Sequence, residues 1–64
     1  MNVEIGNKVK IICNFSNHIF QIGEIVEVKI IGEFMGEIYA YFVCRLNNED
    51  WQGVVYKGEI ENIK

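Results

Sequence analysis

The chain has 64 residues, a length that holds a single small domain at most. Nine acidic and six basic residues give a net charge of −3. The chain therefore lacks the excess of lysine and arginine with which nucleic-acid-binding domains hold phosphates. It has 11 isoleucines and seven valines, but only one leucine, one alanine and no proline. This excess of β-branched residues over good helix formers predicts an all-β fold.

Targeting and cysteine signals predict a cytoplasmic protein. The first residues have neither the basic nor the apolar segment of a signal peptide. The longest apolar run, 38–44, is far shorter than the roughly 20 residues of a membrane span. Cys13 and Cys44 both lie in apolar runs, which predicts buried free thiols in a reducing compartment; one bridge between neighbouring strands is the alternative. The abundance of Ile, Asn and Lys is typical of a bacterial or phage protein encoded by an AT-rich genome.

The first predicted strand is 8–15, where apolar and polar residues alternate. Four apolar side chains are expected on its buried face: Val9, Ile11, Cys13 and Phe15. A long ordered loop, 14–21, is expected to follow. One of its large apolar side chains should pack onto the domain: Phe15, Ile19 or Phe20.

The second predicted strand is 23–31, with a bulge near 24–26 because both of its faces carry isoleucine. Val26, Val28 and Ile30 are expected on one face, alternating with polar residues, and Ile25 and Ile31 on the other. A hairpin loop with glycine at both ends, 32–36, should lead into the third strand.

The third predicted strand is 37–46, followed by a turn at 47–50 that is rich in asparagine and acidic residues. The fully apolar face is expected to be the core face: Ile38, Ala40, Phe42, Cys44 and Leu46. The opposite face, with Tyr39, Tyr41, Val43 and Arg45, is expected to point outward.

The fourth predicted strand is 51–56, and Lys57-Gly58 ends it. The segment 59–63 is too short for a stable α-helix and fits one 3₁₀ turn. Ile60 is expected to fill the end of the barrel and Ile63 to be the last pairing residue.

The order of these segments resembles the bacterial type of SH3-like barrel, a superfamily that includes KOW-like modules and the small photosystem I subunit. The matching segments are G-N-K-V-K-I (6–11), G-E-I-V-E-V (23–28), Y-F-V-C-R-L (41–46) and W-x-G-V-V-Y-K-x-E-I-x-x-I (51–63). The resemblance implies one small five-stranded barrel domain over residues 1–64, with a short 3₁₀ turn before the last strand. The proline-binding motifs of signalling SH3 domains are missing, so no site residue is carried over.

Few residue combinations in the chain could support catalysis. Ser16 and His18 are the only serine and histidine, and no sequence feature indicates how Ser16 would be activated. A zinc site usually needs four ligands, whereas Cys13, His18 and Cys44 supply three without a family spacing. The sequence therefore predicts that the protein is not an enzyme and has no catalytic residues, cofactor or metal.

The candidate binding residues are aromatic, apolar and acidic side chains outside the expected core: Phe34, Met35, Tyr39, Tyr41, Trp51, Tyr56, Glu49 and Asp50. They predict a non-catalytic protein–protein interaction module that binds a partner with a basic surface, such as a bacterial or phage accessory or inhibitor protein. The alternatives are a KOW-like nucleic-acid-associated module and a weak homodimer formed through an exposed sheet edge. For Trp51, the alternative to a contact is a structural role covering the open end of the barrel. The partner is predicted to be neither nucleic acid nor membrane.

Overall fold

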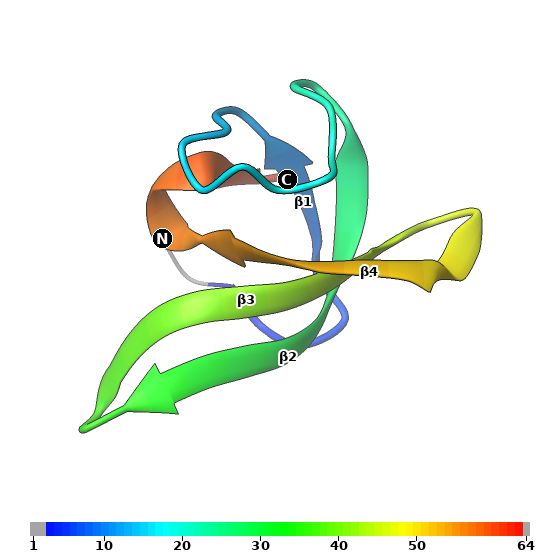
Figure 1. The fold of residues 1–64 in the computed structure, drawn as a ribbon. Coiled ribbons are helices and arrows are strands. Elements are labelled where there is room, and N and C mark those ends of the chain that lie inside the picture. Colours follow the sequence, from blue (N-terminus) through cyan, green and yellow to red (C-terminus); the bar gives the residue numbers. More distant parts are fainter. Residues whose placement is uncertain (1–2, 64) are drawn as a thin grey trace.

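The computed structural model describes residues 3–63 and confirms an all-β fold with five strands. The elements are β1 (Lys8–Ile11), β2 (Ile25–Phe34), β3 (Glu37–Arg45), β4 (Asn48–Tyr56), the 3₁₀ turn η1 (Lys57–Glu59) and β5 (Ile60–Asn62) (Figure 1). Within this part of the chain, no helix has the length and apolar character that a membrane crossing requires.

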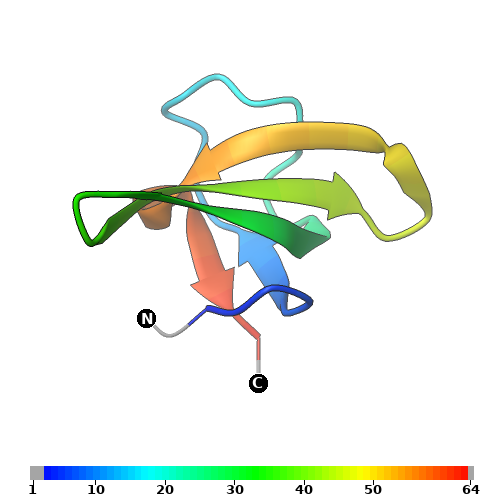
Figure 2. The same cartoon turned by 90° about the horizontal axis from the view of Figure 1, so that it is seen from below.

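All five strands are antiparallel and form one sheet in the order β4-β3-β2-β1-β5. The long strand β2 connects the two halves of the sheet, because its first residues pair with β1 and most of its length pairs with β3. Figure 2 shows β1 and β5 turned away from the direction of β3 and β4. In the described residues β4 and β5 are the two ends of the sheet and do not pair, so the predicted closed barrel is not confirmed.

The core lies on the inner side of the bent sheet. It includes Val3, Val9, Ile11, Phe20, Val26, Val28, Tyr41, Val43, Val55 and Ile60. Phe20 is the residue of the long loop that packs inward, whereas Phe15 and Ile19 are exposed. Ile60 is buried as predicted, but β5 ends before Ile63, which is exposed.

The predicted faces of β3 are right only in part. Ala40 and Cys44 are buried as predicted, each 1% exposed, but the side of the strand that packs into the core is the opposite one. Tyr41 and Val43 point into the core and are each 1% exposed, whereas Phe42 is 41% exposed. The register explains this orientation, because Val43 pairs with Val28 of β2 and Tyr41 with Val55 of β4, both core residues. Since a strand alternates between faces, fixing Tyr41 inward directs its neighbour Phe42 outward.

The irregular positions of β2 differ from the prediction as well. The register shifts lie between Val28 and Ile30 and between Gly32 and Glu33, not near 24–26. The first shift adds one residue to β2, so Ile30 does not share the inward face of Val26 and Val28 but turns outward and is 56% exposed.

The two hairpin turns are shorter than predicted. Phe34 pairs with Glu37, so Met35 and Gly36 alone form the β2–β3 turn, with φ values of 53° and 81°. Two positive φ values match the twist of the adjoining strands. Arg45 pairs with Asn48, which places the next turn at 46–47 and makes residues 48–50 of the predicted turn part of β4.

Candidate functional site

A buried carboxylate joins the long loop to η1. Glu59 is fully buried and accepts hydrogen bonds from the backbone N–H of Ser16 at 2.9 Å and of Tyr56 at 2.8 Å. The Ser16 hydroxyl lies 2.8 Å from both carboxylate oxygens. The backbone carbonyl of Glu59 accepts the N–H of Ile12, so main chain and side chain of one residue both fix the loop.

The surroundings of Glu59 favour its charged form. Burial is the largest single influence and raises the pKa of the carboxyl. The hydrogen bonds from Ser16 and Tyr56 and the nearby His18 ring act in the opposite direction and together hold the pKa below its ordinary value. A buried carboxylate that accepts several hydrogen bonds remains ionised for this reason.

His18 lies beside this carboxylate but is oriented by backbone groups. Its Nδ1 accepts the N–H of Phe20 at 3.1 Å, so the ring hydrogen is on Nε2, which donates to the Cys13 carbonyl at 2.8 Å. Nε2 is also 3.6 Å from Glu59 Oε2. The Ser16 hydroxyl donates to Glu59 instead of to the ring, so the geometry of a serine nucleophile activated by histidine is not formed. The structure therefore brings Ser16 and His18 together as parts of a loop anchor.

The two cysteines have different surroundings and form no bond with each other. Cys13 is exposed, so its predicted burial is wrong, because β1 ends at Ile11. Cys44 is buried, as predicted, and its burial raises the pKa of the thiol. A protonated buried thiol is a poor nucleophile. Across residues 3–63, no cluster of three His, Cys, Asp or Glu side chains has the arrangement of a metal site.

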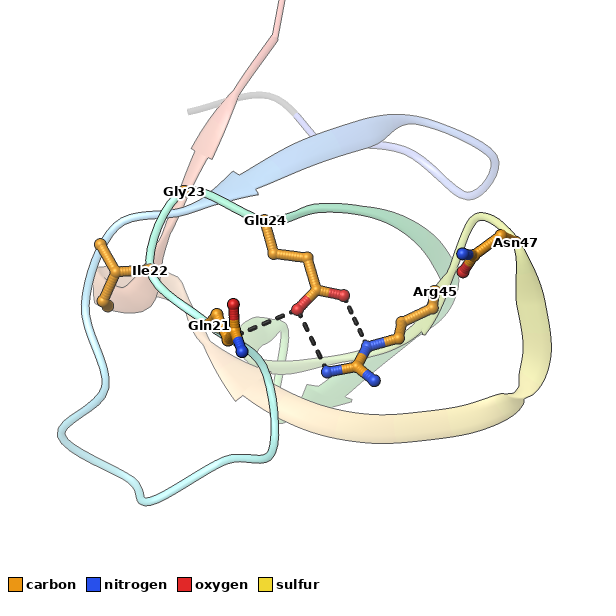
Figure 3. A pocket seen from close by; sticks show the side chains of 6 residues that line it. All are labelled: Gln21, Ile22, Gly23, Glu24, Arg45 and Asn47. Atoms are coloured by element: carbon orange, nitrogen blue, oxygen red, sulfur yellow. Dashed lines mark hydrogen bonds and ion pairs between the residues drawn. The ribbon is translucent and has the colours of Figure 1, made fainter.

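An open hollow of about 570 Å³ lies between the end of the long loop and the end of β3 (Figure 3). Its lining residues are Gln21, Ile22, Gly23, Glu24, Arg45 and Asn47. Arg45 Nε donates to Glu24 Oε2 at 2.6 Å, and its guanidinium lies 4.4 Å from the centre of the Trp51 ring. Both charges in this hollow are already paired, so they are not available to bind a ligand. Trp51 is 46% exposed and stacks with Arg45, whose guanidinium also lies 5.9 Å from the centre of the buried Phe20 ring. A partner contact and a structural cover of the barrel end both stay predictions for Trp51.

An apolar row crosses the outer face of β2, β3 and β4. Ile30 pairs with Phe42, and Phe42 pairs with Val54, so the three side chains are direct cross-strand neighbours. They are 56%, 41% and 37% exposed, respectively. We call this face, together with Tyr39 and Tyr56, the outer apolar face.

Tyr39 and Tyr56 extend this row toward the β2–β3 hairpin and the long loop. The Tyr39 ring approaches Gly32, whose missing side chain would lie 3.2 Å from it on the same face as Ile30. Tyr56 stacks with Phe15 at a distance of 6.3 Å between ring centres. The outer apolar face is therefore continuous with aromatic side chains at both of its margins.

The other predicted site residues are spread over several places. Phe34 and Met35 are exposed at the hairpin tip, as predicted, and Tyr41 is buried, so its predicted outward position is wrong. Glu49 contacts Lys29 at 3.4 Å, whereas the backbone N–H of Asp50 donates to the Asn48 side chain.

Sequence reasoning missed three members of the outer apolar face, Ile30, Phe42 and Val54. A usable signal was present, since 37–46 is apolar on both faces. A sheet packed on one side leaves large side chains of its other face exposed, even though the small Ala40 and Cys44 on that face are covered.

Charge is distributed unevenly along the chain. Residues 24–56 contain six acidic and two basic residues, a net charge of −4, while the remaining residues carry a net charge of +1. Both bases of this segment are paired, Lys29 with Glu27 and Glu49, and Arg45 with Glu24. The strands that carry the outer apolar face are thus the acidic part of the molecule.

Comparisons with known proteins do not assign the chain to a family. No family model matches it, and no curated protein or solved structure has significant similarity to it. The site must therefore be interpreted from its own geometry.

Proposed function

We propose that the chain is a non-catalytic protein–protein interaction domain with an SH3-like barrel architecture. The strand order β4-β3-β2-β1-β5, the long loop after β1 and the 3₁₀ turn before β5 support the architecture. The shared strand β2 and the single inner core support it further. A non-catalytic role agrees with the engagement of Ser16, His18 and Glu59 in anchoring the loop.

The observation that carries the proposal is the outer apolar face. Cross-strand neighbours on a solvated sheet face are usually polar, whereas Ile30, Phe42 and Val54 form an unbroken apolar row. Contiguous exposed apolar groups on a soluble domain mark contact surfaces, and aromatic residues are enriched at the centres of such surfaces.

The charge around this face favours a partner with a basic surface. The net charge of −4 in 24–56 attracts a basic partner and repels a second copy of the same face. An inhibitor that occupies the basic groove of a host nucleic-acid enzyme is one form of such an interaction. The KOW-like alternative requires contacts with phosphates, which this charge opposes.

The test is to measure binding of a purified partner by the wild-type chain and by Phe42→Thr. The partner would first be identified by capture from the source organism. Phe42→Thr removes a central apolar contact and replaces it with a β-branched residue that also favours strands. We expect the dissociation constant to rise at least about tenfold. Ile5→Thr is the matched control, because Ile5 is exposed in the turn before β1.

Three measurements identify failure of this proposal. Equal affinity of Phe42→Thr and wild type would refute a role for the outer apolar face. A gel shift of an oligonucleotide that weakens steeply with salt would favour the KOW-like alternative. A dimeric mass by light scattering, instead of 7.4 kDa, would favour self-association. Circular dichroism would establish that each variant is folded.

A further inference from the structure

A hollow of about 380 Å³ lies on the outer side of the β2–β3 hairpin, beside the outer apolar face. Its lining residues are Phe34, Glu37, Ile38 and Tyr39. Phe34 pairs directly with Glu37 near the tip, and Tyr39 is also part of the outer apolar face. The hollow thus combines two exposed aromatic rings with one carboxylate.

The carboxylates of this hairpin are not neutralised within the described residues. Neither Glu33 nor Glu37 forms an ion pair in residues 3–63, whereas Glu24, Glu27 and Glu49 each contact a basic side chain. Lys57 lines a different hollow, on the inner side of the hairpin, together with Glu33 and Glu37, but it forms no ion pair with either of them within residues 3–63. The outer hollow contains no basic lining residue.

We propose that this hollow binds a cationic side chain of the partner protein, with arginine preferred. The proposal rests on the proposed function and names the chemistry of one contact within it. A guanidinium stacks on the faces of aromatic rings and forms charge-assisted hydrogen bonds with a carboxylate. Phe34 and Tyr39 supply the rings and Glu37 supplies the carboxylate. Arginine is preferred because its charge is planar and less strongly hydrated than that of lysine.

Two other sources of positive charge fit this hollow less well. A divalent metal ion needs several oxygen ligands, and only one lining residue has a carboxylate. A membrane surface is usually anionic and is repelled by Glu33 and Glu37, although Met35 at the tip is 87% exposed. A side chain with an apolar stem and a cationic head matches both the rings and the carboxylate.

The experiment uses three capped peptides of sequence Gly-Gly-X-Gly-Gly, in which X is arginine, lysine or citrulline. Citrulline has nearly the shape of arginine without its charge. Binding to the ¹⁵N-labelled chain is followed by amide chemical shifts. We expect the arginine peptide to shift the amides of 33–39, the lysine peptide to act more weakly, and the citrulline peptide to have no effect. Glu37→Gln should weaken arginine binding about fivefold, while Glu61→Gln, an exposed acid on β5, should leave it unchanged.

Two results would overturn this inference. One is equal shifts with arginine and citrulline, or no shifts with arginine. The other is arginine-induced shifts of similar size beside exposed acids elsewhere, such as Glu4 and Glu61, which would indicate unspecific attraction of charge. Phe42→Thr separates the two proposals. If Phe42→Thr abolishes binding of the purified partner and the arginine peptide does not shift the amides of 33–39, the proposed function is supported and the cation site is refuted. If Phe42→Thr has no effect, the proposed function fails instead.

Discussion

The loop side of the domain and its outer apolar face place their side chains in opposite ways. On the loop side, the charged Glu59 is fully buried and the loop 12–24 is fastened to it. On the outer face of β2–β4, apolar side chains such as Phe42 and Ile30 are exposed. The buried charge is stable because it accepts several hydrogen bonds. The exposed apolar groups still contact water after folding, so a partner that covers them would remove further apolar surface from water. The difference indicates that one side maintains the fold and the other is available for binding.

The largest expected effect comes from removing the charge on the loop side. Glu59→Gln replaces one carboxylate oxygen with an amide NH₂ group. In the wild type each oxygen accepts hydrogen bonds from N–H or O–H groups, so in the variant buried donors lose their acceptor. We expect a loss of about 2–3 kcal/mol in the free energy of unfolding, which lowers Tm by roughly 10–20 °C in a domain of this size. Thermal unfolding followed by circular dichroism measures the change.

Glu61→Gln is the matched control for this comparison. Glu61 lies two residues further along, on the exposed side of β5, and its substitution should change stability by less than about 0.5 kcal/mol. Similar losses in the free energy of unfolding of the two variants would show that the buried Glu59 contributes no more to stability than an exposed acid.

Acid should act on the same carboxylate. The pKa of Glu59 is lower in the folded than in the unfolded chain, so its contribution is fully present above the unfolded pKa of about 4.3 and decreases as the pH falls through the folded value. Urea unfolding at a series of pH values from 7 downward measures this dependence. The wild type should lose more stability in acid than Glu59→Gln does. Parallel losses in both proteins would contradict the role assigned to this carboxylate.

A smaller effect is expected where the loop packs on the inner face. A Cβ added at Gly53 would lie 2.9 Å from the ring of Phe20, which is buried and has little room to move. Gly53→Ala should therefore cost about 1–2 kcal/mol. At Gly58 an added Cβ would meet the ring of Phe15 at 3.3 Å, but Phe15 is exposed and can rotate away. Chemical denaturation of both variants tests the difference, and equal losses would show that Phe20 adjusts as easily as Phe15.

Much of the fold could be predicted from the sequence, because it depends on local chemistry. The β-branched composition predicted the all-β class, and alternation in 8–11 predicted the inward positions of Val9 and Ile11. The exposed Phe34 and Met35 were predicted because a glycine-flanked hairpin tip cannot reach the core. These predictions needed no information on which strands pair.

The faces of β3 and the role of Glu59 were decided by contacts between distant parts of the chain. Both sides of 37–46 are apolar, so alternation alone could not select one, and the pairing of Tyr41 with Val55 made the selection. Glu59 is 43 residues from Ser16, and only the return of the chain beside the loop provides the donors that let its charge be buried. The sequence by itself determined which segments extend and roughly where the chain turns between them, because those preferences are local. The tertiary structure decided which apolar side chains remain exposed and which charge is buried, because register and hydrogen-bond partners arise only when the strands assemble.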